Sequence, residues 1–555
     1  MSVAVHYTCT KPPESTRHTV FGLHVAVGDL IKAYCRFSSV DKIPFLVASR
    51  QEWDEVLAFA AEAGVDPSRL VALDRRFPEN NLADVTTVFR AEPDTQGLLW
   101  QRQLTGSFSF CGLAHAISGV EAGSVLQEYC LAPSEKTDAI LCPSQAVKSA
   151  IAAFWESYAD YLEERFNTTY RCPVRLPVIP LGIEVKKFAP TPDKRAHIRN
   201  LLGLNNDAFV LLWVGRLSAA IKAHPLAMFQ AAQKAAQKTG QRLHLIMMGY
   251  FVPEDARPLF EKLAAETCPD VEVRFVASDD ARFPNGLWAA GDIFLSLIDN
   301  VQESFGLTPI EAMAAGLPRV ISDWDGYRDS VTEGEDGFLI RTTQPPPGNG
   351  LALTAQVLSG REGYGGFLAK TALTVAVDAD QAAERIALLI NDKEQRRTMG
   401  QKARAKAEAV YDWSVIIPAY EALWADLAAR RAQITEKRAS MRCYAQPLLP
   451  DPYTMYRDYP TAPMAETTII GLALAPNAIE RLLTNALNTY AFDVLLPSQE
   501  LAAVLLWLGQ NGNVSIARIF SSFPHLDKPA LWRSLAWLQK LGIVKNSPCQ
   551  GGPAR

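Results

Sequence analysis

Short apolar segments alternate with amphipathic helical segments along most of this chain, in two successive series. A parallel β-sheet produces this alternation, because each strand needs a helical crossover to reach its parallel neighbour. The sequence therefore predicts an α/β protein with two doubly wound, Rossmann-like domains. Candidate strands lie at residues 4–8, 43–49, 86–91, 107–112 and 139–144 in the first series, and at 208–215, 243–249, 271–277, 292–298, 318–322 and 337–340 in the second.

A proline-rich stretch separates the two series, with prolines at positions 173, 177, 180 and 190 that favour an extended connection. We assign residues 1–180 to the first domain and 181–410 to the second. Helical periodicity then predicts a crossover helix over 411–440. Residues 441–490 begin rich in proline and tyrosine and are expected to form a linker. Three short helical patterns in 491–555 predict a helix-turn-helix or winged-helix-like module.

Length and composition are those of a globular protein with more than one domain. The 555 residues exceed the roughly 250–300 at which single cores stop growing. A hydrophobic content of 48% with 21% charged residues allows large cores. The net charge of -5 gives no global attraction to nucleic acid or to an anionic membrane.

The remaining sequence signals concern location and metal binding. Nine cysteines are scattered without a CxxC pair or metal-ligand spacing, so we expect reduced, structural thiols and no metal site. The N-terminus lacks a signal-peptide pattern, and no apolar run approaches the ~20 residues of a membrane span. We expect a cytoplasmic protein, at most one lying against a membrane.

Two polar clusters follow predicted strands of the second series, where ligands of open α/β sheets bind. Gly215 and Arg216 follow the first of these strands, and Lys222 lies six residues further on, a spacing that brings two cations onto one anion. The second cluster is the run from Glu303 to Glu311, which reads ESFGLTPIE.

A helix beginning at Thr308, with Pro309 in its first turn, would direct free backbone N–H groups and the positive end of its dipole toward a phosphate. The carboxylates Glu303 and Glu311 suit sugar or ribose hydroxyls instead. Cations combined with hydroxyl acceptors indicate a sugar nucleotide.

These motifs resemble glycosyltransferase family 4. The resemblance rests on GRL with a following lysine, on two glutamates separated by seven residues in ESFGLTPIEAMAAGLP, on VIPLGIEVKKF and on YDWSVIIPAYEALW, and it covers about residues 170–430. It implies a GT-B fold and a retaining transferase that uses a nucleotide-diphosphate sugar as co-substrate, without another cofactor. The acceptor, a carbohydrate, lipid or small molecule, would bind the first domain.

The resemblance also implies roles for individual residues. Arg216 and Lys222 would neutralise the donor diphosphate, Glu311 would hold the ribose, and Glu303 and His115 would contact the transferred sugar. Gly22 would approach the phosphates from the first domain. The donor-binding residues completing this set are Gly215, Ser304, Phe305, Gly306 and Leu307.

The chain departs from the family pattern in three places. The first loop, TVFGLH, lacks the usual glycine pair, Arg319 replaces an apolar strand residue, and the tail beyond residue 440 lies outside the pattern. A docking role toward a protein partner is the favoured function of this tail. We expect no nucleic-acid partner, because its tryptophans lie at helical spacing with leucines, as core residues do.

Simpler interpretations remain for most of these residues. Arg216 and Lys222 could each be a surface cation, Glu303 a solvated loop residue, Glu311 a carboxylate favoured by a helix dipole, and His115 a satisfied core histidine. We interpret His224 as bracing its loop. The DWD string at 323–325 is interpreted as structural, and GREGYGG at 360–366 as a flexible loop.

Other functions also remain open. A sugar-nucleotide epimerase or a phosphorylase could share this fold, although no lysine-rich pyridoxal phosphate site is visible. A degenerate transferase acting as a binding or regulatory protein is the alternative from another class.

Overall fold

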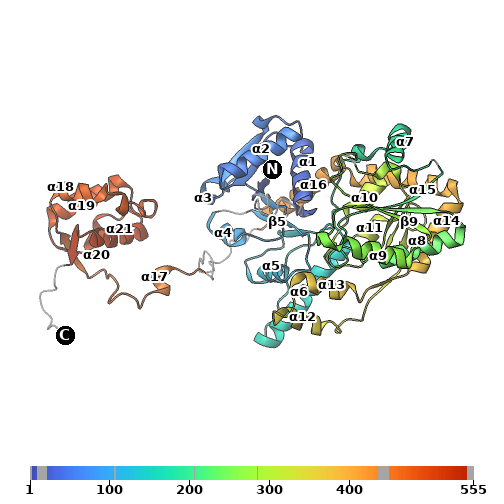
Figure 1. The fold of residues 1–555 in the computed structure, drawn as a ribbon. Coiled ribbons are helices and arrows are strands. Elements are labelled where there is room, and N and C mark those ends of the chain that lie inside the picture. Colours follow the sequence, from blue (N-terminus) through green and yellow to red (C-terminus); the bar gives the residue numbers. More distant parts are fainter. Residues whose placement is uncertain are drawn as a thin grey trace. The chain divides into compact units, whose positions relative to one another are not determined.

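The computed structural model describes residues 3–8, 22–105, 108–205, 207–283, 286–434 and 449–546 (Figure 1). The chain forms two compact units, Met1–Gln446 and Pro447–Arg555. The larger unit contains two six-stranded parallel sheets, one for each predicted series.

The first sheet has the strand order β3-β2-β1-β4-β5-β6. Its strands are β1 (Val3–His6), β2 (Ile43–Val47), β3 (Leu70–Asp74), β4 (Thr87–Arg90), β5 (Ser109–Leu113) and β6 (Ala139–Leu141). The helices are α1 (Gly22–Phe37), α2 (Arg50–Glu62), α3 (Pro78–Asn81), α4 (Leu98–Thr105), α5 (Val120–Leu131) and α6 (Gln145–Phe166). The sequence did not predict β3, because only Leu70 of this edge strand is buried.

The second sheet has the order β12-β11-β10-β7-β8-β9. Its strands are β7 (Phe209–Val214), β8 (Leu243–Met248), β9 (Val271–Val276), β10 (Ile293–Ser296), β11 (Arg319–Ser322) and β12 (Gly337–Ile340). The helices of this second domain are α7 (Pro192–Leu201), α8 (Leu226–Thr239), α9 (Arg257–Thr267), α10 (Leu307–Ala314), α11 (Tyr327–Ser330), α14 (Ala379–Asn391) and α15 (Lys393–Lys406). Each of the eleven strands expected from the sequence is present in one of the two sheets.

An insertion follows the second sheet. It contains β13 (Thr342–Thr343), α12 (Leu351–Leu358), α13 (Tyr364–Ala372) and β14 (Ala376–Val377). The GREGYGG string, expected to be a flexible loop, is the turn between α12 and α13, and α13 begins inside it at Tyr364.

Helix α16 (Trp413–Ala432) returns to the first domain and packs against α1 and β4. The Trp424 ring lies 5.3 Å from the Tyr34 ring and 5.0 Å from the Phe89 ring, centroid to centroid. Two doubly wound domains joined by a returning helix are the arrangement of the GT-B fold, so the predicted fold class is confirmed.

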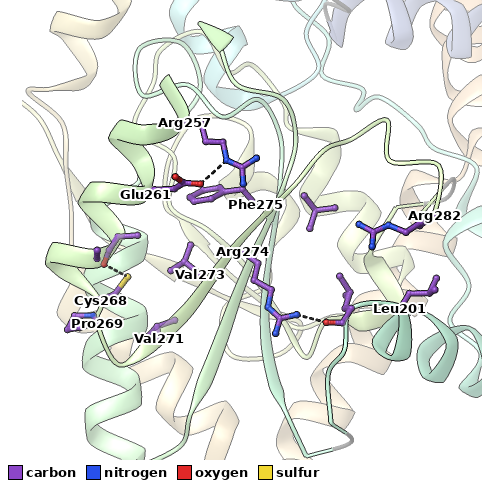
Figure 2. Close-up of a pocket in the computed structure, with 14 residues that line it drawn as sticks. Leu201, Arg257, Glu261, Cys268, Pro269, Val271, Val273, Arg274, Phe275 and Arg282 are labelled. Atoms are coloured by element: carbon purple, nitrogen blue, oxygen red, sulfur yellow. Dashed lines mark hydrogen bonds and ion pairs between the residues drawn. The ribbon is translucent and has the colours of Figure 1, made fainter. Parts of the chain in front are cut away.

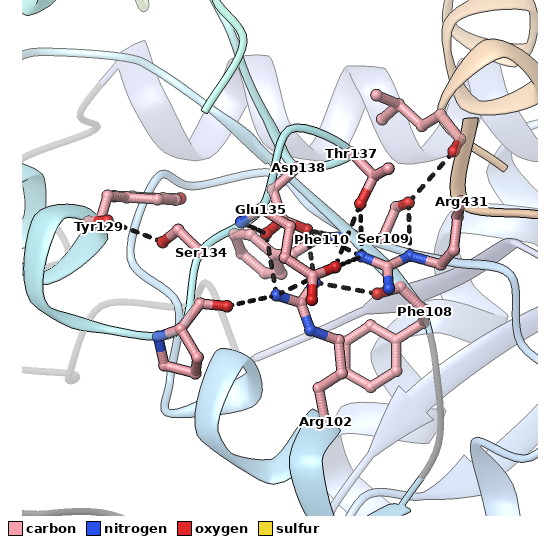
Figure 3. Close-up of polar contacts among 12 residues, drawn as sticks. Arg102, Phe108, Ser109, Phe110, Tyr129, Ser134, Glu135, Thr137, Asp138 and Arg431 are labelled. Carbon is pink, nitrogen blue, oxygen red and sulfur yellow. Dashed lines mark hydrogen bonds and ion pairs between the residues drawn. The ribbon is translucent and has the colours of Figure 1, made fainter. Parts of the chain in front are cut away.

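A buried ion cluster fixes the end of α16 to the first domain (Figure 3). Arg102 donates to both oxygens of Asp138, at 2.6 and 3.0 Å. Arg431, near the end of α16, donates to Glu135 and to the Ser109 hydroxyl. Because two cations meet two carboxylates in the protein interior, no charge of the cluster is left unpaired.

A second buried ion pair explains the departure at Arg319. Its side chain is fully buried and donates to Asp336 and to the Ser330 carbonyl, the latter at 3.1 Å. Lys406 also donates to Asp336, at 3.0 Å. The arginine therefore serves a local ion cluster beneath the sheet.

The smaller unit has an antiparallel sheet with the order β16-β15-β17. Its elements are α17 (Pro452–Met455), β15 (Ile469–Leu472), α18 (Pro476–Leu483), α19 (Ser498–Asn511), β16 (Val514–Ser515), α20 (Ile516–Ser522), α21 (Lys528–Lys540) and β17 (Val544–Asn546). The expected linker thus holds β15 and α18, because Ile470 is fully buried in the core of this unit. Trp507, Trp532 and Trp537 belong to the same core or pack on it.

Two further findings concern the described part of the chain. Its cysteines at positions 35, 111, 130, 142, 172 and 268 are free. No single described helix is long and apolar enough to cross a membrane, although the bent pair Ala486–Val494 and Ser498–Asn511 passes that test on length and composition.

Candidate functional site

The predicted donor-site residues gather at the switch point of the second sheet. Strands β7 and β10 are neighbours there, while the chain after β7 continues outward to β8. Arg216 follows β7, and the loop with Glu303 follows β10. Open α/β sheets bind ligands at this position, beyond the carboxyl ends of the strands.

Glycine is required where the chain leaves β7. A Cβ atom on Gly249 would lie 1.8 Å from the Gly215 carbonyl oxygen, and one on Gly215 would lie 3.1 Å from the Trp213 ring. Gly215 donates its N–H to the Met248 carbonyl at 3.0 Å. These close contacts bring the backbone ahead of Arg216 against the end of β8.

Lys222 and Glu303 form an ion pair at the centre of the site, with the ammonium donating to Oε2. Their side chains are only 13% and 16% exposed. Arg216 reaches the same loop and donates from Nη2 to Gln302 Oε1 at 3.1 Å. The two cations predicted to meet one anion are thus brought to one loop.

Electrostatics keep this pair ionised. Burial alone would raise the pKa of Glu303, but the positive charge and hydrogen bond of Lys222, with the charge of Arg216, hold that pKa below its ordinary value. Burial would likewise lower the pKa of Lys222, and the neighbouring Glu303 carboxylate raises it instead. Two cations against one carboxylate leave a positive charge for an anionic ligand.

Asp325 adds a second carboxyl group beside this pair. It is held at φ 41°, and its Oδ1 accepts the N–H of Tyr327 at 3.0 Å. Burial, and then the charge of Glu303, raise the pKa of Asp325 well above its usual range. Among the described residues no group of three or more histidines, cysteines or acidic residues could hold a metal ion.

Asn300 joins the loops of the site and was not predicted as a site residue. Its amide donates to the Ala220 carbonyl at 2.6 Å, and its Oδ1 accepts the N–H of Gln302 at 2.8 Å. Its carbonyl accepts the Trp324 indole at 3.0 Å. The only sequence signal for this role is its position directly after a predicted strand.

His224 has the bracing role inferred from the sequence. Its N–H donates to both carboxylate oxygens of Asp299, at 3.2 and 3.3 Å, and its Nδ1 accepts the N–H of Leu226 at 3.3 Å. Burial raises the pKa of Asp299 to about 7.

Helix α10 begins at Leu307, one residue before the expected start, and no side chain caps it. Gly306 precedes it at φ 85°, and a Cβ atom there would lie 2.2 Å from the Tyr327 ring. The first N–H groups of α10 are therefore without a side-chain acceptor, as an anion site requires.

Ser304 and Phe305, predicted to bind the donor, contact other parts of the protein. The Ser304 carbonyl accepts the Ser144 hydroxyl of the first domain at 2.7 Å. Phe305 is buried in the core shared by α10, α16 and the first domain. Both residues fix the glutamate loop against the first domain.

Asp329 makes a second polar contact between the domains. Its Oδ2 accepts the N–H of Gln145, the first residue of α6, at 2.6 Å. A carboxylate is stabilised at a helix N-terminus. The sequence held no signal for this contact, because the two residues are 184 positions apart.

Glu311 lies apart from the ion pair, on α10. It lines a cavity of about 160 Å³ that Asp29 and Lys32 of α1 also line. Burial, and then the charge of Asp29, raise the pKa of Glu311 to about 7, while the charge of Lys222 opposes this shift. Glu303 and Glu311 therefore face different surroundings.

His115 and Gly22 lie in the first domain. His115 lies two residues beyond β5, and its Nε2 hydrogen bonds with the Ala91 carbonyl at 2.8 Å. Burial lowers the pKa of His115 to about 4, so the ring is neutral at physiological pH. Gly22 is the first residue of α1. The loop that precedes it lies outside the described residues.

Comparison with known proteins gives partial matches. Residues 194–346 match the family described as glycosyl transferases group 1. A D-inositol 3-phosphate glycosyltransferase from Geodermatophilus obscurus is 31% identical over 177 residues, which are 31% of this chain and 38% of that protein. A UDP-Gal:alpha-D-GlcNAc-diphosphoundecaprenol alpha-1,3-galactosyltransferase from Escherichia coli is 30% identical over 174 residues, covering 31% of this chain and 42% of that protein. The chain thus spans less than half the length of these relatives.

A solved structure of Anabaena HepE in complex with UDP covers 77% of this chain and all of its own, with a TM-score of 0.49 and 16% identity. The family match contains Arg216, Lys222, Glu303 and Glu311. Residues 194–346 are thus similar to the group 1 glycosyl transferases, the family that the sequence motifs also resemble.

Proposed function

We propose that this protein transfers a sugar from a nucleotide-diphosphate sugar to an acceptor held by the first domain. One observation carries the proposal: the segment that matches the group 1 glycosyl transferases also brings Arg216, Lys222 and Glu303 to one loop at a sheet switch point. A relative whose name specifies a UDP-galactose donor supports a nucleotide-sugar substrate.

The charges of the site suit the leaving diphosphate. Arg216, Lys222 and the uncapped start of α10 would stabilise the negative charge that develops as the glycosidic bond breaks. The Lys222 ammonium, now paired with Glu303, would be shared with a phosphate oxygen. Glu303 would then be free to accept a hydrogen bond from a sugar hydroxyl.

We further propose that transfer retains the anomeric configuration, as the resemblance to glycosyltransferase family 4 implies. The leaving phosphate would help to deprotonate the acceptor hydroxyl on the same face of the sugar. The neutral ring of His115 cannot act as a cation at physiological pH. Its role would be to orient the sugar by hydrogen bonding.

The nucleotide and sugar can be identified by thermal stabilisation. A ligand present at 100 times its dissociation constant stabilises the folded state by about 2.7 kcal/mol. We expect one nucleoside diphosphate and its sugar conjugate to raise the melting temperature, and the matching sugar to appear on an acceptor or as a hydrolysis product. If no nucleoside diphosphate or conjugate in a broad panel stabilises the protein, the proposed function is wrong.

Two alternative functions predict different experimental results. An epimerase would convert the sugar nucleotide without an acceptor, which chromatography of the products detects. A regulator that binds DNA would retain duplex DNA in a filter-binding assay at moderate salt.

The smaller unit disfavours the DNA-binding alternative, because its own chain already binds three side chains of helix α21. Trp537 donates to the Asn488 carbonyl at 3.0 Å, Arg533 donates to the Val494 carbonyl at 2.7 Å, and Ser534 accepts the N–H of Leu496 at 2.9 Å. A recognition helix must present such side chains to the major groove.

A further inference from the structure

Strand β9 forms one edge of the second sheet, where β8 is its only hydrogen-bonded neighbour among the described strands. Gly249 donates its N–H to the Val276 carbonyl at 2.9 Å, so the even-numbered residues of β9 direct their backbone groups toward β8. Backbone groups alternate along a strand. The N–H and C=O groups of Val273 and Phe275 therefore point outward, away from the sheet.

A groove of about 820 Å³ runs along this edge (Figure 2). It is bounded by the end of α7 on one side and by α9 on the other, with Leu201, Ala264 and Cys268 among its lining residues. A groove that leaves one strand edge open between two helices has the shape to admit an additional strand.

Strand β6 forms an edge of the first sheet, and the protein's own chain covers that edge. Ile140 donates to the Arg175 carbonyl at 2.9 Å, and Cys142 donates to the Pro177 carbonyl at 2.8 Å. The segment after α6 thus covers that edge. For β9, by contrast, no described strand other than β8 forms a ladder.

The two faces of β9 differ in chemistry. Phe275 turns toward α9, where its ring lies 6.2 Å from that of Phe260. Val271 and Val273 share this face, because side chains alternate along a strand. Glu272 and Arg274 lie on the opposite face, where Arg274 donates to Glu272 Oε1 of its own strand at 2.7 Å and to the Leu202 carbonyl. Arg242 of the same protein contacts the other Glu272 oxygen at 3.0 Å. A strand added here must alternate apolar and charged residues.

Strand β9 itself has this alternation. In an antiparallel pair of two copies, the Glu272–Arg274 ion pair within each strand would be exchanged for two such pairs between the strands. If two copies pair about Val273, Glu272 of each lies opposite Arg274 of the other, and Val271 lies opposite Phe275. The two Val273 residues would exchange both backbone hydrogen bonds. The Glu272–Arg274 pairs would occupy non-hydrogen-bonded positions, where cross-strand side chains are closest.

We propose that two copies of this protein associate through β9, pairing antiparallel about Val273 to form a continuous twelve-stranded sheet across the dimer. The interface closes under two-fold symmetry, as most soluble homodimers do. The pairing also gives hydrogen-bond partners to the outward backbone N–H and C=O groups of this edge strand. Natural proteins otherwise shield such an edge by charge, proline or a covering segment. The proposal does not depend on the activity of the enzyme.

A charge-swap experiment on the full-length protein tests this register. Glu272→Arg places arginine opposite arginine, and Arg274→Glu places glutamate opposite glutamate, so each variant alone should be monomeric or dimerise roughly tenfold more weakly. A mixture of the two variants restores both opposite-charge pairs and should give a heterodimer. The double variant Glu272→Arg/Arg274→Glu should dimerise like the wild type. Sedimentation measures the masses, and circular dichroism verifies folding.

Hydrogen exchange distinguishes this interface from contacts elsewhere. In the dimer the amides of Val273 and Phe275 should be protected, and in each single variant they should exchange faster. A monomeric wild-type protein would overturn the proposal and leave the groove to an extended segment of another protein. A dimer that both single variants retain, with unchanged exchange in 271–276, would overturn it as well.

Discussion

Lys222 donates a hydrogen bond to Glu303, although the two residues are 81 positions apart. The resemblance to glycosyltransferase family 4 implies that the lysine binds the donor diphosphate and that the glutamate contacts the transferred sugar. Their contact means that a bound phosphate must compete with Glu303 for the ammonium group. Donor binding and the position of Glu303 are therefore coupled.

Replacing Lys222 should affect both stability and donor binding. Lys222→Met leaves the mostly buried Glu303 carboxylate without its principal partner, so we expect the free energy of unfolding to fall by about 2–4 kcal/mol at neutral pH. The affinity for a nucleoside diphosphate should fall at least roughly tenfold, because a charge-assisted contact is lost. Chemical denaturation and calorimetry measure the two effects.

The double variant Lys222→Met/Glu303→Gln is the matched control for this prediction. It removes the unpaired charge and should regain most of the stability without regaining nucleotide affinity. Equal nucleotide affinity in the wild type and in Lys222→Met would contradict a diphosphate-binding role for the lysine.

Glu311 should make the stability of the protein depend on pH. Its pKa is raised from 4.5 to about 7 in the folded state, so the folded state holds this proton more tightly than the unfolded state. Stability from this group is present below pH 4.5 and is lost as the pH rises toward 7. Glu311→Gln should therefore gain stability relative to the wild type over that range, on the order of 2 kcal/mol at the upper end.

Asp299 provides the control, since burial raises its pKa to about 7 as well. The pH dependence that remains in Glu311→Gln should fall further in a variant that also carries Asp299→Asn. A constant stability difference between Glu311→Gln and the wild type from pH 4.5 to 7 would show that Glu311 has an ordinary pKa.

The sequence predicted much of the fold, because periodicity reports which faces are buried. The strands β7 and β8 are apolar at every position except His244 and were recognised. The edge strand β3 was missed, because four of its five residues are partly or fully exposed. The strand β15 was missed because the proline-rich segment before it suggested a linker.

The candidate site was predicted only where its residues follow strands or form a motif. Arg216, Lys222 and Glu303 do so, and the structure brings them together. The contacts of Ser304 and Asp329 with α6 depend on how the two domains meet, which no local pattern encodes. Arg319 looked anomalous in a strand because its partner Asp336 lies beyond the next helix.

Transfer should need no divalent metal ion. Arg216, Lys222 and the start of α10 supply positive charge to the diphosphate without an ion. We expect the same rate in EDTA as in magnesium, measured as release of nucleoside diphosphate. Loss of activity in EDTA that magnesium restores would contradict this prediction.

Removal of residues 441–555 should leave nucleotide binding intact. The compact unit that contains both sheets ends at Gln446, and α16 ends at Ala432. A shorter protein ending at residue 426 is the control, because it lacks Arg431 and so breaks the ion cluster with Glu135. We expect the first truncation to melt near the full-length protein and the second to melt at a lower temperature. If the first folds without binding any nucleotide, the assigned boundary is wrong.

Replacing Glu303 by alanine and replacing Glu311 by alanine should change different kinetic constants. Glu311 lies on α10 and lines a cavity together with Asp29 of α1. Its proposed contact with the ribose should change little between the ground state and the transition state. Glu311→Ala should therefore mainly raise the donor KM. Glu303 adjoins both cations, and its contact with the sugar governs the geometry of attack. Glu303→Ala should lower kcat on the order of 100-fold.

Binding of the free nucleoside diphosphate separates the two roles. Glu303→Ala should bind it at least as tightly as the wild type, because Lys222 no longer has to leave a carboxylate to meet the phosphate. Glu311→Ala should bind it more weakly, because the ribose contact is present in the free nucleotide too. Calorimetry of both variants, beside their steady-state kinetics, measures this difference. Weaker nucleotide binding in Glu303→Ala, together with a loss of turnover alone in Glu311→Ala, would mean that the donor lies in the opposite orientation along α10.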